Sequence, residues 1–399
     1  MPRYNLPMLS ALRTGFIFSA LLCAGPHVAR LSAQGNPVAG QLTIDTIVVV
    51  TENVFGDQDG ILRIANNFRF TTRPSVVRRE LLFQQGDALD PAVLAETARN
   101  LRALGVFRRV AIDTVTVDGN FTVVVRTFDG WSTQITANLS SSAGTIVWAA
   151  GLTETNFLGL ANLASAIYSK GVDRNNITFG TRLNRLLGGN AQLNSAFVHF
   201  TDGTQFVWQT GFPFRSFSDR HAVEFFGEVT DRRFLRYVTR SVTDVDTTQF
   251  QRRAFRNVVT AAYAPVAGAR EYLRVGVAGQ IKREDFVLRV HRDSLIPDTV
   301  TAAVGVFSEY RRANFKVGYY YNAFGREEDI DLSTLVQVVT WAAPSAFGYQ
   351  RDGISPGISF ATGVGFPRGY LKLTAGASAL FTSAGIDSGR VADSFTEAP

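Results

Sequence analysis

The sequence predicts an α+β domain followed by a long antiparallel β-barrel, and three observations lead to this fold class. Residues 41–129 mix strand and helix patterns. From Trp131 onward, apolar and polar residues alternate along segments of about ten residues, which is typical of strands with one exposed face. Residues 1–33 have the form of an export signal, and after them no apolar run approaches the roughly 18 residues of a membrane helix.

Composition excludes several classes of protein. The 399 residues are 46% hydrophobic and 19% charged, which is unlike a disordered chain. The single cysteine, Cys23, lies in the export signal, so cysteine-based zinc, redox or nucleophilic chemistry is not expected in the mature chain. The net charge of +6 includes the arginines of the signal, and the other basic residues are scattered among acidic ones. We therefore expect a solvated charged surface and no nucleic-acid partner.

Residues 1–33 contain the parts of a secretory signal peptide. Arginines come first, an apolar segment follows at 15–25, and small residues at 31–33 provide a cleavage site. A lipoprotein signal through Cys23 is the less favoured alternative, because Leu22 stands where such sites have a small residue.

The first domain, residues 41–129, is expected to fold in the order β-α-α-β-β. Asp90 is a good N-cap before Pro91, and Gly105 provides the C-terminal stop of the same helix. The expected elements are a strand at 42–50, an inserted hairpin around 56–60, a helix from Pro74 to the turn at 85–87, a helix from Pro91, and strands at 106–117 and 121–128 joined through Gly119.

The alternation from 131 to 399 fits two architectures. A soluble β-sandwich would bury the apolar faces, whereas a membrane barrel would turn them toward lipid. The many consecutive strands, about 12 to 14, favour the barrel. Aromatic residues near segment ends, such as Phe214 and Phe217, are interpreted as parts of interfacial girdles. In this barrel Val275 and Val277 are expected to face lipid.

Three stretches carry a resemblance to a known superfamily. They are 78–87 (RRELLFQQGD), 101–110 (LRALGVFRRV) and 151–160 (GLTETNFLGL). They resemble the outer-membrane assembly factors of BamA and TamA type, whose members join periplasmic POTRA domains to a surface-antigen-type barrel. The first two stretches are similar to the POTRA core, and the third to the turn between the second and third barrel strands. The matching core and turn residues are Gly86, Leu94, Leu101, Gly105, Phe107 and Val110, and those of the barrel turn are Asn156, Phe157, Leu158 and Gly159.

The resemblance implies a periplasmic POTRA-like domain at 41–129 and a transmembrane barrel at 131–399. It also implies that the second POTRA strand has an exposed edge, which can accept another chain by β-augmentation. The candidate edge residues are Val106, Arg108, Val110 and Ile112.

Two features depart from the superfamily pattern. Its arginine-glycine-aromatic motif lies in a long loop inside the barrel, and the match here is Arg368, Gly369 and Tyr370. Alternation resumes on both sides, so a tight turn between two strands is favoured over such a loop. The chain also ends at 396–399 without the terminal aromatic strand of these barrels. We expect a C-terminally incomplete chain, with a smaller barrel as the alternative.

No pattern of catalytic residues stands out. The histidines after the signal, His199, His221 and His291, lack metal-binding spacing, and no nucleophile elbow or phosphate loop occurs. We therefore expect no enzymatic activity, no cofactor and no metal site. The acidic run 327–331 is expected to be a solvated loop, with loose cation binding as the weaker alternative.

The resemblance implies a factor for insertion or translocation of proteins at the outer membrane. Its partners would be the lipid bilayer, unfolded outer-membrane or secreted clients, and periplasmic accessory proteins. Clients would be received by the first domain and inserted where the first barrel strand, at about 131–141, separates from the last. A passive channel or secretion pore with a POTRA-like docking domain is the alternative.

Overall fold

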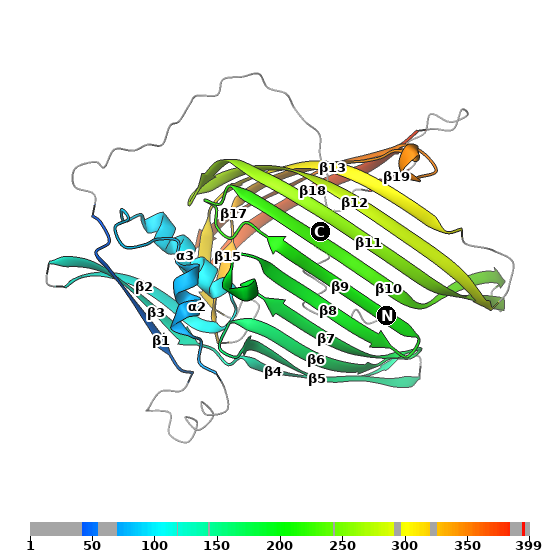
Figure 1. The fold of residues 1–399 in the computed structure, drawn as a ribbon, viewed down its shortest axis with the longest axis horizontal. Coiled ribbons are helices and arrows are strands. Elements are labelled where there is room, and N and C mark those ends of the chain that lie inside the picture. The colour runs from blue at the N-terminus through cyan, green and yellow to red at the C-terminus, as the bar shows by residue number, and fades with distance from the viewer. Residues whose placement is uncertain are drawn as a thin grey trace.

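The computed structural model describes residues 42–54, 70–117, 119–142, 144–241, 244–290, 297–319, 325–383 and 393–395. The expected signal peptide and the hairpin around 56–60 lie outside these ranges. The chain forms a small α/β module and a curved antiparallel sheet of 14 strands, called the large sheet (Figure 1). Within the described ranges, no helix is both long enough and apolar enough to cross a membrane.

The module has the predicted order β-α-α-β-β. Its elements are β1 (Thr46–Glu52), α2 (Pro74–Glu80), α3 (Pro91–Ala103), β2 (Phe107–Val117) and β3 (Asn120–Asp129). Strand β3 is central, with β1 parallel on one side and β2 antiparallel on the other. The helices cover this sheet with a core that includes Val77, Leu101, Phe107, Val110, Val123 and Val125, and Leu94 packs against it.

Local signals set both ends of the second helix as predicted, but only the start of the first. The Asp90 carboxylate accepts a hydrogen bond from the Ala92 amide at 2.8 Å, and Gly105 follows the helix with φ +74°. Helix α2 ends at Glu80, earlier than the predicted turn at 85–87, because Leu81 adopts extended backbone angles. Gly86 lies in that later turn with φ +92°, where its amide donates to the Ile44 carbonyl.

The large sheet joins strands that are neighbours in sequence. They are β4 (Thr133–Ser142), β5 (Thr145–Phe157), β6 (Asn162–Lys170), β7 (Asn175–Leu183), β8 (Gln192–Phe200), β9 (Gly203–Phe212), β10 (His221–Ser241), β11 (Asp244–Gly268), β12 (Glu271–Val290), β13 (Thr299–Arg312), β16 (Thr334–Ala343), β17 (Gly353–Phe366), β18 (Gly369–Thr382) and β19 (Asp393–Phe395). A hairpin of β14 (Phe315–Tyr319) and β15 (Glu327–Asp331) interrupts the series between β13 and β16. Strand β4 lies at one end of this order and β19 at the other.

The two faces of the large sheet differ as the alternation predicts. The outer face exposes apolar side chains such as Ile135, Val277 and Leu371. The inner face carries hydrogen-bonded polar pairs, for example Gln209 with Glu224. The curvature and the apolar outer face fit a β-barrel, although β4 and β19 are not paired with each other in the described part of the chain.

The expected aromatic girdle is wrong for two residues. Phe214 and Phe217 lie in the loop between β9 and β10 and turn toward the inner face. The Phe217 ring meets the buried Tyr272 ring edge-on at 4.8 Å, and the Arg274 guanidinium lies 3.9 Å from the centre of the Phe214 ring. Both rings therefore fill space inside one end of the sheet and do not face lipid.

Candidate functional site: a docked module and two strand edges

The module lies across one end of the large sheet, here called the docking end (Figure 1). The loops that it contacts join β5 to β6, β7 to β8, β9 to β10 and β13 to β16. Only residues 130–132 separate β3 of the module from β4 of the sheet. These contacts hold the module beside the first strands of the sheet and over its inner face.

The predicted barrel turn is the first contact. It joins β5 to β6, the second and third strands of the large sheet, as the resemblance implied. Asn156 is 1% exposed, and its side-chain amide donates to the Phe70 carbonyl and the Thr72 hydroxyl, both at 3.0 Å. The side-chain oxygen of Asn156 accepts a hydrogen bond from the Ala161 amide at 2.9 Å. One side chain therefore both shapes the turn and binds the module.

The backbone of this turn requires glycine at its centre. Gly159 has φ +69°, and a Cβ atom there would lie 2.5 Å from the Thr71 carbonyl oxygen. Two flanking residues, Leu158 and Ala161, also have positive φ, at 57° and 53°, which is unfavourable for residues with a side chain. The hydrogen bond from the Arg73 amide to the Gly159 carbonyl, at 3.0 Å, helps to hold this conformation.

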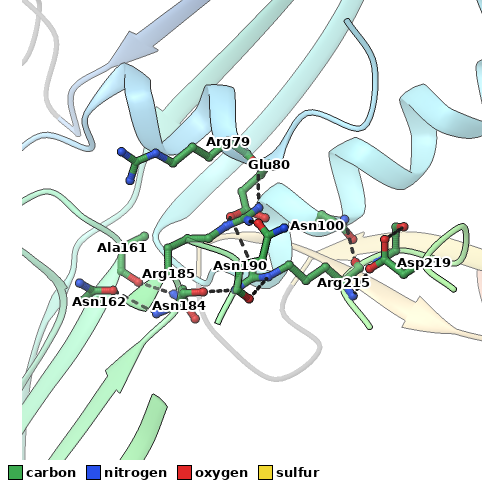
Figure 2. Close-up of polar contacts among 11 residues, drawn as sticks. Arg79, Glu80, Asn100, Ala161, Asn162, Asn184, Arg185, Asn190, Arg215 and Asp219 are labelled. Atoms are coloured by element: carbon green, nitrogen blue, oxygen red, sulfur yellow. Dashed lines mark hydrogen bonds and ion pairs between the residues drawn. The ribbon is translucent and has the colours of Figure 1, made fainter. Parts of the chain in front are cut away.

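Glu80 is the centre of a second contact, shown in Figure 2. Its buried carboxylate accepts a hydrogen bond from the Arg185 guanidinium at 2.8 Å and lies 3.7 Å from the Arg215 guanidinium. Arg185 also donates to the Arg79 carbonyl at 2.6 Å. Burial and the neighbouring Arg185 lower the pKa of Arg215. Because removal of one partner would leave an unpaired buried charge, we regard Glu80 as the main polar anchor of α2.

Helix α3 makes the third contact. Glu96 is buried and accepts the Phe217 amide at 2.5 Å, and burial is the main cause that raises its pKa. The Arg99 guanidinium lies 4.4 Å from the centre of the Phe315 ring, which is a cation–π distance. Asn100 donates to the Arg215 carbonyl at 3.0 Å. One face of α3 therefore packs against Phe217 and Phe315 at the docking end.

The β14–β15 hairpin makes the fourth contact, and it corrects the expectation of a solvated acidic loop at 327–331. Asp329 receives two hydrogen bonds from Arg102 in α3, each 2.7 Å. The Arg326 guanidinium donates to the Gly105 carbonyl at 3.2 Å. Glu327 and Asp329 are paired with arginines of the module, because the hairpin folds back onto α3 and β2. Glu328 and Asp331 pair with arginines of the hairpin and of β13.

Strand β2 is an edge strand of the module, as predicted, but part of its edge is covered. The Val106 carbonyl accepts the Gly130 amide at 2.7 Å and so faces β3, not the open edge, and Arg108 lies at a bulge in the β2–β3 pairing. The Val110 amide donates to the Glu327 carboxylate of the hairpin at 3.2 Å. Within the described residues, β3 is the only strand that pairs with β2, so the opposite edge of β2 is open from Ile112 to Val117.

Strand β4 provides a second open edge. It pairs with β5 alone in the described part of the sheet. Its large side chains, Ile135 and Leu139, are 81% and 77% exposed, so few side-chain contacts support this strand. Its position in the order is thus held mainly by the backbone ladder to β5.

The remaining predicted motif lies in a tight turn. Phe366 pairs with Gly369, so Pro367 and Arg368 form a two-residue connection between β17 and β18. The turn was the favoured interpretation, and the placement of Arg368, Gly369 and Tyr370 in a long loop inside the barrel is wrong. Sequence reasoning missed Glu80, Asn100 and Arg185 as docking residues, because nothing local links the three.

No protein-family model and no curated protein matches the sequence. Among solved structures, BamA from Haemophilus ducreyi lacking POTRA domains 1–3 matches 86% of this chain at 13% identity with a TM-score of 0.35. CdiB from Escherichia coli matches 91% of this chain and 72% of its own at 12% identity with a TM-score of 0.42. CdiB from Acinetobacter baumannii matches 86% of this chain and 68% of its own at 11% identity and 0.35.

The chain is similar in structure to BamA and CdiB. BamA also belongs to the superfamily that the sequence resembles. The chain spans 56% of the length of the BamA chain that it matches. The assignment of the large sheet as a β-barrel rests on its strand pairing and on its apolar outer and polar inner faces.

Proposed function

We propose that the chain is an outer-membrane insertion or translocation factor. The module would be a POTRA-like domain in the periplasm that receives unfolded clients, and the seam at β4 would pass them into the membrane. The observation that supports this proposal is a pair of open strand edges in one chain, β2 in the module and β4 in the large sheet, which are joined through β3 and the three residues 130–132. An open edge binds an extended chain through backbone hydrogen bonds, whatever its sequence.

The hydrogen-bond register identifies which amides of β4 face its open edge. The Thr155 amide donates to the Ser132 carbonyl at 3.1 Å, so these two residues form a hydrogen-bonded pair. In an antiparallel ladder such pairs alternate with non-bonded ones. The amides of Ile135, Ala137 and Leu139 therefore point away from β5 toward the open edge.

Ala137→Pro tests the proposal, because it removes one amide from the open edge and leaves the ladder to β5 intact. The full chain is reconstituted in lipid vesicles and offered a urea-unfolded outer-membrane barrel protein. Folding of the client is measured by its heat-modifiable mobility in gels. We expect Ala137→Pro to slow client folding several-fold, and Ala137→Val, which keeps the amide, to behave as the wild type.

Two controls separate the outcomes. The heat-modifiable mobility of the variant itself reports whether its sheet is intact, and Leu139→Pro repeats the test at the next outward amide. Wild-type rates of client folding in both proline variants would rule out the seam. A channel would conduct ions equally in all variants, so unchanged conductance together with unchanged client folding would favour the passive channel or secretion pore.

A further inference from the structure

A basic cavity lies at the end of the large sheet opposite the docking end. It has a volume of about 410 Å³ and is lined by the turn 171–174 between β6 and β7 and by Arg232, Arg233, Phe234 and Arg252. The module contacts the β5–β6 and β7–β8 connections, so the β6–β7 turn lies at the other end of the strands. The cavity is therefore separate from the docking contacts and independent of the proposed function.

Two arginines face each other across this cavity. Arg232 of β10 and Arg252 of β11 are direct partners in the strand register. Arg232 alternates with the exposed Val229, so it shares the inner face with Thr230 and Glu228. Like charges placed directly opposite on one face of a sheet repel each other and destabilise the pairing. Arg252 has a carboxylate partner in Glu284, whereas Arg232 has none among the described residues, so an anion between the two guanidinium groups would relieve this repulsion.

Each of the other arginines at the cavity is paired with a carboxylate. Asp202 lies 3.2 Å from both Arg174 and Arg233. Glu284 receives Arg252 at 2.9 Å and also pairs with Lys282. Glu228, the other acid on this part of the inner face, accepts hydrogen bonds from Gln205 and Thr230.

Arg232 lacks such a partner. In the described part of the chain, no carboxylate lies within 4.0 Å of its guanidinium, which instead rests 5.3 Å from the centre of the Phe200 ring. Its cross-strand neighbour on the β9 side is Gly203, which has no side chain to offer. A Cβ atom at Gly203 would lie 2.6 Å from the Arg232 Cα, so the strand cannot accept a larger residue here. Gly203 therefore provides no polar side chain beside Arg232.

We propose that this cavity binds a phosphate-type anion between Arg232 and Arg252. Guanidinium groups suit this ligand because their planar N–H groups bind phosphate oxygens in pairs. The turn 171–174, Arg233 and Phe234 complete the lining of the cavity. The phosphate could belong to a free ion or to a lipid headgroup, and the experiment distinguishes the two.

The test compares Arg232→Gln with Arg253→Gln in the full chain. Arg253 is the next residue to Arg252 on the same strand, is 60% exposed and pairs with Asp231, so its loss changes the net charge equally outside the cavity. The protein in detergent is titrated with inorganic phosphate by calorimetry, and the protein in nanodiscs is compared with phosphatidate and with phosphatidylcholine as the added lipid.

We expect Arg232→Gln to weaken phosphate binding about tenfold or more, while Arg253→Gln binds as the wild type. An equal loss in the phosphatidate nanodiscs would identify a lipid headgroup as the ligand, and a loss with inorganic phosphate alone would identify the free ion. Equal binding by the wild type and Arg232→Gln in both settings, or no binding by the wild type, would overturn the proposal. Thermal unfolding of each variant checks that the sheet is intact.

Discussion

At Glu96, burial and hydrogen bonding act on the same carboxyl group in opposite directions. Burial raises its pKa, whereas the hydrogen bond from the Phe217 amide and the charge of Arg99 lower it, and burial is the larger effect. A carboxyl whose pKa rises on folding contributes stability that is complete below its ordinary value of 4.5 and is lost as the pH rises through the raised value. We therefore expect the contribution of Glu96 to the stability of the docked module to be larger near pH 4 than near pH 7.

The measurement is thermal unfolding of the wild type and of Glu96→Gln across this range of pH. The glutamine keeps an oxygen for the Phe217 amide but has no proton to gain, so the difference between the two proteins isolates Glu96. Glu52→Gln, which removes a 45% exposed carboxylate from the module, serves as the control. A difference between the wild type and Glu96→Gln that stays constant with pH would contradict the prediction.

Residue roles set by near neighbours could be predicted from the sequence, and those set by distant neighbours could not. The Asp90 cap and the left-handed Gly105 depend on the next few residues alone, and both are confirmed. Glu80 looked like an ordinary residue of a helix. Its role depends on Arg185, which is 105 positions away, and no local pattern reports that distance.

Among the elements, the β14–β15 hairpin has a testable effect on strand β2. The pair of Arg102 and Asp329 is nearly buried, with side chains 9% and 14% exposed. Removing one partner of such a pair costs about 3–5 kcal/mol, because the other charge stays buried without it. Asp329→Asn is therefore expected to release the hairpin, and with it the bond from the Val110 amide to Glu327. Hydrogen exchange at Val110 should become faster in this variant.

Asp285→Asn is the matched control for the hairpin. It makes the same chemical change in an ion pair with Arg283, whose side chain is 63% exposed and far from the module. We expect no change at Val110 in this variant. If exchange at Val110 were as slow in Asp329→Asn as in the wild type, the hairpin would not be what covers the edge of β2.

The periodicity of apolar residues predicted the strands and most of the module. It did not predict the contacts of the acidic segment 327–331, where charge is the main feature of the sequence. Alternation cannot distinguish a solvated acidic run from one that meets arginines elsewhere in the fold, so the contact of 327–331 with α3 was missed. The first helix was predicted too long for a related reason. Val77 and Leu81, four residues apart, fit one helical face in sequence, but the backbone becomes extended at Leu81, and Phe83 enters the core.

For the whole molecule, the orientation of the two faces can be measured directly. Cysteines in place of Val275 and Val277 on the outer face should react with a thiol probe dissolved in the membrane. Cysteines in place of Gln280 and Lys282 on the inner face should react with a water-soluble probe. Gly276 is unsuitable for this test, because a Cβ atom there would lie 2.3 Å from the Phe307 ring. The reverse labelling pattern would mean that the apolar face is not in lipid.

The sequence predicted the strand order of the large sheet, but it did not predict the position of the module against that sheet. Its 14 strands, paired in chain order apart from the β14–β15 hairpin, lie within the predicted range, because each strand pairs with the next through a short connection. The position of the module depends on loops from four separate places in the chain. Their contacts are single hydrogen bonds and ion pairs, which leave no periodic trace in the sequence.

The short connection between β3 and β4 makes the module and the sheet one mechanical unit. The Gly130 amide is tied to the Val106 carbonyl at 2.7 Å, and the Ser132 carbonyl to the Thr155 amide at 3.1 Å, so the link is fixed at both ends and has no slack. Tension on a chain held at β2 would pass through β3 directly into the first rungs of the β4–β5 ladder. The large side chains of β4, Ile135 and Leu139, are exposed, so its backbone hydrogen bonds to β5 would be the main resistance to this tension.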